Sequence, residues 1–177
     1  LWIGQSVENS LKNKEENFCP WGRARLNAYM ASSYDVLSIK ESAYAFGIRA
    51  SEMLNKVDVD NLTDNDKLIL ADCYNVSGYA VLHRSEKILQ DDWASAHGAI
   101  LKAMEILNGT NRSEYSDSLL TKIHGNIGAC YLKIGDYERA KEWHERALAE
   151  RLEMLARNNS IENKFLIYKA YRCLGAD

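Results

Sequence analysis

Proline is almost absent from this chain of 177 residues, where Pro20 is the only one. Proline interrupts helices because its ring fixes φ and removes a backbone N–H, so nearly the whole chain after Pro20 is free to be helical. Stretches rich in Gly and Ser, or in Gln, are also missing, which excludes an obvious flexible linker. We therefore expect residues 1–20 to form an N-terminal capping segment or the tail of a preceding domain. Residues 21–177 are expected to form one continuous architecture.

Long apolar runs and an excess of positive charge are lacking as well. No run of eighteen apolar residues occurs, so the sequence predicts no membrane span. The net charge of −3 differs from the basic balance typical of nucleic-acid binders, and no nucleic-acid partner is expected. The chain starts at Leu1 without Met and without the apolar core of a signal peptide. We expect a cytoplasmic piece of a longer protein, with the remaining domains of that protein as neighbours.

Motifs that carry catalysis or bind metal are the third absence. The four cysteines form no CxxC pair and are expected to be free thiols, buried where they fall in apolar helical patterns. They are Cys19, Cys73, Cys130 and Cys173. The four histidines form no HExxH pair, and no phosphate-binding glycine loop or GxSxG elbow occurs. The sequence therefore predicts a protein without cofactor or metal that is not an enzyme, in which His124 and His144 are half-buried packing residues.

What the chain does contain is a helix–turn–helix pattern over residues 121–155. Its first half places on one apolar face the residues Ile123, Ile127, Cys130 and Tyr131. Gly128 stands where a second helix can approach closely. Gly135 suits the end of the first helix, and Asp136 suits the N-cap of the second. The second helix, which starts near Tyr137 and has no closing proline, is expected to run on to about Arg157.

The same layout recurs upstream, marked by pairs of alanines seven residues apart in the second helix of each hairpin. These pairs are Ala43 and Ala50, Ala96 and Ala103, and Ala140 and Ala147. Each pair follows a helical pattern that contains an aromatic residue. The sequence thus predicts an all-α fold of antiparallel helix hairpins, about three and a half in number. The expected units are 21–57, 64–108, 118–157 and a truncated unit from 163.

The third unit resembles the tetratricopeptide repeat family. The positions that carry the resemblance are Gly128, Tyr131, Gly135, Tyr137, Ala140 and Ala147, and more weakly Gly78, Ala96 and Ala103 in the second unit. The resemblance implies a right-handed superhelical solenoid, in which stacked hairpins share one continuous core. The spacing between units exceeds the family's period of about 34 residues. In this respect the chain is similar to the extended repeats of kinesin light chains.

The resemblance also implies a concave groove, lined by the first helices of the hairpins, that binds a peptide or a partner helix. Projecting the register of the third unit predicts the groove residues Arg25, Ala28, Ser32, Asp72, Asn75, Tyr79, His83, Lys122, Gly125, Ala129, Lys133, Lys169 and Arg172, and Asn126 is expected to line the groove as well. The later half of this set is basic, which indicates an acidic peptide or a phosphopeptide; the alternative is that the lysines are merely solvated. Tyr79 and His83 either contact the ligand or cover the insertion that follows them.

One role within the family is excluded by the groove residues. Members that hold the C-terminal carboxylate of a chaperone use lysines, asparagines and an arginine at fixed positions. Here Ala28 and Ser32 replace a Lys and an Asn, Val76 replaces a second Asn and Asn126 replaces a basic residue, so that of the five positions only Lys122 is retained. We expect a protein-interaction scaffold within a larger protein. The alternative is a ligand- or peptide-sensing domain attached to a nucleotide-hydrolysing or DNA-binding effector.

Overall fold

Every element in the described part of the chain is an α-helix, which confirms the all-α prediction. The computed structural model describes residues 21–84 and 88–157 and, beyond them, residues 164, 167, 168, 171 and 175. Its helices are α2 (Gly22–Val36), α3 (Lys40–Leu54), α4 (Asp64–Leu82), α5 (Gln90–Asn108), α6 (Glu114–Lys133) and α7 (Tyr137–Arg157). The predicted segment 1–20 lies outside the described residues, as does most of the truncated unit from 163.

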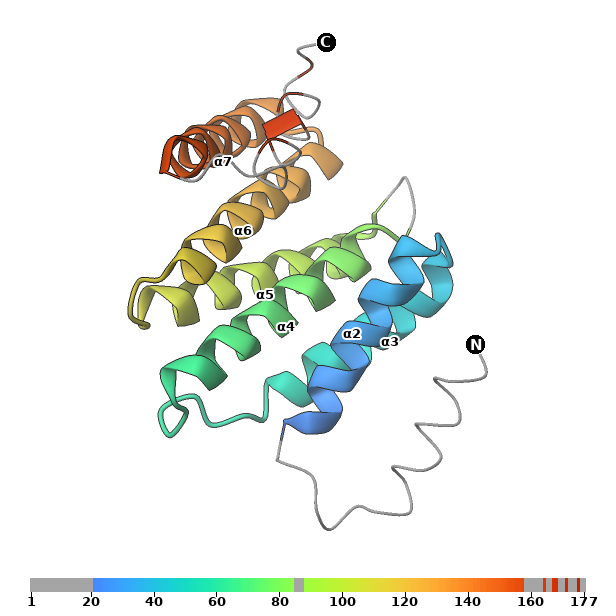
Figure 1. Cartoon of the computed structure of the whole chain (residues 1–177). Coiled ribbons are helices and arrows are strands. Elements are labelled where there is room, and N and C mark those ends of the chain that lie inside the picture. Colours follow the sequence, from blue (N-terminus) through green and yellow to red (C-terminus); the bar gives the residue numbers. More distant parts are fainter. Residues whose placement is uncertain are drawn as a thin grey trace.

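The helices pack as consecutive antiparallel pairs, α2 with α3, α4 with α5 and α6 with α7 (Figure 1). Each pair also packs on the next one along the chain. The first helices α2, α4 and α6 contact one another in that order, while α3 packs on α4 and α5 packs on α6. Figure 1 looks onto α2 and α4, with α3 and α5 behind them. The three first helices therefore share one side of the molecule.

Side-chain caps set the start of three helices. Thr63 caps α4 by accepting a hydrogen bond from the backbone N–H of Asp66, and Asp136 Oδ1 accepts the backbone N–H of Arg139 at the start of α7. Ser113 forms a capping box with Ser116, so α6 begins at Glu114, whereas the third unit was expected from about 118. A Ser in place of the usual Glu or Gln explains why the sequence pattern did not indicate this cap.

The turn between α6 and α7 follows the predicted chemistry. Gly135 has a φ of 78°, the left-handed conformation that glycine adopts at a helix end without strain. Helix α7 then runs to Arg157, which confirms the predicted length of the second helix. Tyr137 is different: it was predicted as a repeat packing position, but its side chain is 70% exposed. It is the first residue of α7, where its ring lies beyond the buried contact between the helices.

Small residues lie where the helices approach most closely. The alanines at positions 43, 50, 96, 103, 140 and 147 are all buried, with at most 3% of their surface exposed. A Cβ atom added at Gly78 would lie 2.7 Å from the backbone oxygen of Ala96, and one added at Gly128 would lie 2.8 Å from the ring of His144. The first helix of each of these pairs thus contacts its second helix at a glycine, which allows the two axes to come close.

The contact between α6 and α7 contains buried histidines rather than the half-buried ones that were predicted. His124 is 1% exposed, and its Nδ1 lies 2.8 Å from Oε2 of Glu150. The imidazole of His144, 5% exposed, packs on Gly128. Burial lowers the pKa of His144, and the positive charge of Arg151 lowers it further. This interface therefore favours a neutral His144.

Two cysteines lie in the core of the described residues. Cys73 and Cys130 are free thiols without exposed surface. Burial raises the pKa of each thiol to about 12, so both stay protonated and unreactive near neutral pH. The predictions for Cys19 and Cys173 lie outside the described residues.

Candidate interaction surface

A mixed polar and aromatic surface extends over the first helices of the three pairs. We define it by the residues Arg25 and Tyr29 of α2, Asp72 of α4, and Tyr115 and Lys122 of α6, and call it the α2–α4–α6 face. Helical periodicity explains the membership, because residues four or seven apart lie on the same side of a helix. Arg25 and Tyr29 are four apart, and Tyr115 and Lys122 are seven apart.

A hydrogen bond beneath this face fixes how α4 and α6 lie against each other. Asn126 Nδ2 donates to Asn75 Oδ1 at 2.8 Å, and Asn75 is only 5% exposed. Both were predicted to line the groove, but here their amides bond to each other and join the helices instead. One turn earlier on each helix, the same register places Asp72 near Lys122, and the two charges interact. Ala28, another predicted groove residue, is fully buried and contributes nothing to the surface.

The carboxyl group of Asp72 interacts electrostatically with both cations of the face. Burial raises the pKa of its carboxyl group, while the positive charges of Lys122 and Arg25 partly offset that effect. Within the described residues none of the three side chains closes an ion pair with another. The guanidinium of Arg25 lies instead over the rings of Tyr29 and Trp21, at 5.5 and 5.8 Å from their centroids.

Two tyrosines give the face hydroxyl groups that can reach a ligand. Tyr29 is 39% exposed and Tyr115 is 52% exposed. Burial of their phenol groups raises the pKa of both, and the nearby charge of Asp72 raises it further. Both therefore remain O–H donors at neutral pH. Neither tyrosine was predicted from the sequence. Tyr115 lies in the first turn of α6, which was expected to start later, whereas the i, i+4 spacing of Tyr29 from Arg25 was a usable signal.

The other predicted groove residues of the described chain are only partly accessible. The half-buried ones are Ser32, Tyr79, His83, Gly125, Asn126, Ala129 and Lys133. The rings of Tyr79 and His83 stack with centroids 4.1 Å apart, so these two residues pack on each other at the end of α4. Lys133 is the last residue of α6. The predictions for Lys169 and Arg172 lie outside the described residues.

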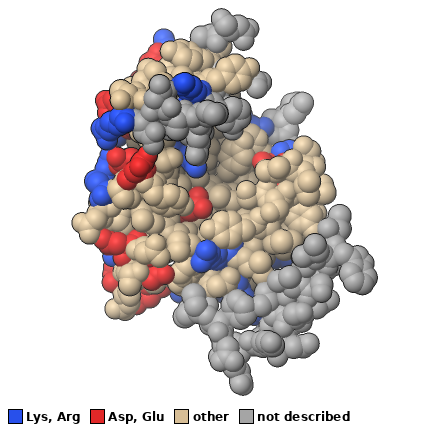
Figure 2. All heavy atoms as spheres, in the orientation of Figure 1, with Lys and Arg blue, Asp and Glu red and all other residues tan. Residues whose placement is uncertain are grey.

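Charge is distributed unevenly over the visible surface. In Figure 2 most charged side chains gather along the left-hand edge, where Figure 1 places α7 and the starts of α6 and α4. The middle of the view, over α4 and α2, shows few charged groups in an otherwise uncharged surface. A charged group in that region therefore has few charged neighbours on the visible surface.

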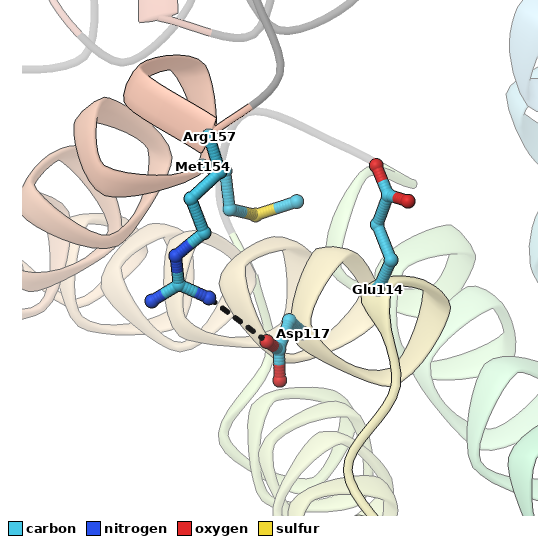
Figure 3. A pocket seen from close by; sticks show the side chains of 4 residues that line it. All are labelled: Glu114, Asp117, Met154 and Arg157. Carbon is cyan, nitrogen blue, oxygen red and sulfur yellow. Dashed lines mark ion pairs between the residues drawn. The ribbon is translucent and has the colours of Figure 1, made fainter.

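A separate cavity of about 430 Å³ lies between the start of α6 and the end of α7 (Figure 3). Glu114, Asp117, Met154 and Arg157 line it. Arg157 is 3.7 Å from Asp117, and Arg112 pairs with the same carboxylate at 2.7 Å. Figure 3 shows Glu114 pointing away from that pair. Its described wall therefore offers the carboxylates of Glu114 and Asp117, the second of them paired with two arginines, and the thioether of Met154.

Neither a metal-binding group nor a membrane-spanning helix is found in the described residues. Over residues 21–84 and 88–157 no three His, Cys, Asp or Glu side chains come together as a metal-binding group. In the same part of the chain no helix combines the length and the apolar character that a membrane crossing requires. Comparison with protein-family models, with curated proteins and with solved structures gives no match. Within the described residues, the α2–α4–α6 face is therefore the candidate functional site.

Proposed function

We propose that this chain is a protein-interaction module of a larger protein, and that its α2–α4–α6 face binds an acidic peptide segment. The observation that carries the proposal is the row of charged groups on three successive first helices: Arg25, Asp72 and Lys122. Two cations and one carboxylate leave a net positive charge on a surface with two exposed tyrosines. A ligand carboxylate placed there gains charge-assisted hydrogen bonds from the cations and further ones from the phenol groups.

The fold that we propose for this module is a right-handed solenoid of tetratricopeptide-like repeats. In this interpretation α2 with α3, α4 with α5, and α6 with α7 are the three described repeats. Support comes from the order of packing, since the first helix of each later pair packs on both helices of the pair before it. Further support comes from the equivalent glycines Gly78 and Gly128, because the second helix of each pair packs closely against the glycine of the first. A stack of this kind exposes its first helices along one side, where ligands bind.

A cytoplasmic location belongs to the same proposal. Its support is the pair of buried free thiols, Cys73 and Cys130, which suits a reducing compartment.

Selection from a displayed library of random linear peptides tests the proposal. We expect the enriched peptides to contain Asp or Glu and to lose at least about tenfold in affinity when Arg25→Glu or Lys122→Glu reverses a charge, because hydrogen bonds to charged groups contribute about 1.5–3 kcal/mol. Lys141→Glu is the matched control, since Lys141 is exposed on α7, away from the face. The proposal is wrong if the enriched peptides lack acidic residues, or if all three variants bind them as the wild type does.

A further inference from the structure

The presence of Asp72 in the middle of the α2–α4–α6 face needs a reason. A carboxylate there repels the acidic ligand that the two cations attract, and a neutral residue would leave a more positive surface. Its charge is also not used in a close ion pair within the described residues, because Arg25 lies over aromatic rings and Lys122 stays apart. The charge of Asp72 is therefore available to act on whatever binds.

The charge balance of the face suggests what Asp72 does. Arg25, Lys122 and Asp72 together leave one net positive charge. A ligand carboxylate neutralises it. A phosphoryl group carries between one and a half and two negative charges at neutral pH, and so leaves an excess of negative charge beside Asp72. In a half-buried setting that excess is poorly screened by water.

We propose that Asp72 makes this face selective for a singly charged carboxylate, supplied by a Glu or Asp side chain, over the doubly charged phosphoryl group of a phosphopeptide. This inference rests on the proposed function and names its ligand class. The two exposed phenols fit the same preference, since Tyr29 and Tyr115 are neutral donors that add hydrogen bonds without adding positive charge. Burial already raises the pKa of the Asp72 carboxyl group, so this environment resists additional negative charge.

Two peptide arrays that differ at a single position test the selectivity. Both carry the same degenerate sequences around a central residue, which is Glu in one array and phosphoserine in the other. The wild-type chain and Asp72→Asn are applied to both, with Lys122→Glu as the variant that should lose binding and Lys141→Glu as the control that should keep it. The Asp72→Asn change keeps the shape of the side chain and removes its charge.

We expect the wild type to be retained about tenfold better by the Glu array than by the phosphoserine array, on the order of one added charge at short range. Asp72→Asn should bring the two arrays to equal retention or reverse their order, mainly through a gain on phosphoserine. Thermal unfolding of the variant reports whether it folds. A wild type that the phosphoserine array retains equally or better overturns the inference even without the variant, and so does a folded Asp72→Asn variant that keeps the wild-type preference for Glu.

The outcomes separate this inference from the proposal beneath it. If the phosphoserine array retains the wild type as well as or better than the Glu array, and Lys122→Glu abolishes that retention, the face binds acidic peptides but Asp72 does not select among them. If Lys122→Glu and Lys141→Glu are retained as the wild type is, binding lies elsewhere on the chain and both ideas fail.

Discussion

The close approach of α4 and α5 at Gly78 gives the sharpest test of the packing. A Cβ atom added there would lie 2.7 Å from both the backbone oxygen of Ala96 and Cγ1 of Ile100. Neither atom is the free end of a flexible side chain, so α4 and α5 must move apart to admit a methyl group. Overpacking of this kind costs about 1–3 kcal/mol. We take the upper value because one of the two contacts is with backbone.

Alanine also stabilises a helix interior by about 1 kcal/mol relative to glycine, which offsets part of that cost. The net effect of Gly78→Ala is thus a loss of about 2 kcal/mol in the free energy of unfolding. For a domain of this size, that corresponds to a melting temperature lower by about 4–8 °C. Gly128→Ala should cost less, because the atoms that it meets belong to the imidazole of His144, which has more freedom to shift than backbone.

Gly98 supplies the matched control. It is exposed on α5, and a Cβ atom added to it meets nothing within 4 Å. Gly98→Ala should therefore keep the full helical gain and raise the melting temperature by about 2–4 °C. Thermal unfolding followed by the helical circular dichroism signal measures all three variants. A Gly78→Ala variant that melts at or above the wild-type temperature, while Gly98→Ala behaves as expected, would contradict the close approach of α4 and α5.

Three further predictions concern α6 and α7. Ala140→Arg should lower the free energy of unfolding by at least about 3 kcal/mol, because a charged side chain replaces a buried methyl group, whereas Glu142→Arg on the exposed side of α7 should change it little; equal melting temperatures would contradict this. Ser113→Ala should cost about 0.5–2 kcal/mol in urea unfolding through loss of the capping box, against no such loss for the exposed Ser95→Ala. The pKa of His144 is lowered on folding. Its contribution to the free energy of unfolding is therefore fully present above a pH of about 6.5 and is lost as the pH falls. The decline in stability between about pH 7.5 and 5 should therefore be smaller in His144→Gln than in the wild type, and an equal decline would show that His144 is not its source.

The sequence by itself determined the helices and their turns. A nearly proline-free chain with apolar residues at helical spacing predicts helices, and local signals such as Gly135 with Asp136 place the turn before α7 correctly. These features depend on residues a few positions apart, so they can be recognised without knowing the rest of the fold. The capping box at Ser113 is equally local and was missed only because its partner is an unusual one.

Only the tertiary structure decided which side of each first helix is available to a ligand. Periodicity gives the direction of a side chain around its own helix, but it does not say which neighbouring helix covers that direction. Asn75 and Asp72 both project toward the predicted groove by sequence, yet Asn75 is held by Asn126 while Asp72 remains half-exposed between two cations. The distinction arises from the register of α4 against α6, which is a contact between residues about fifty positions apart in the chain. The same reason applies to the glycines, since Gly98 meets open space and Gly78 meets α5, although both lie within helices.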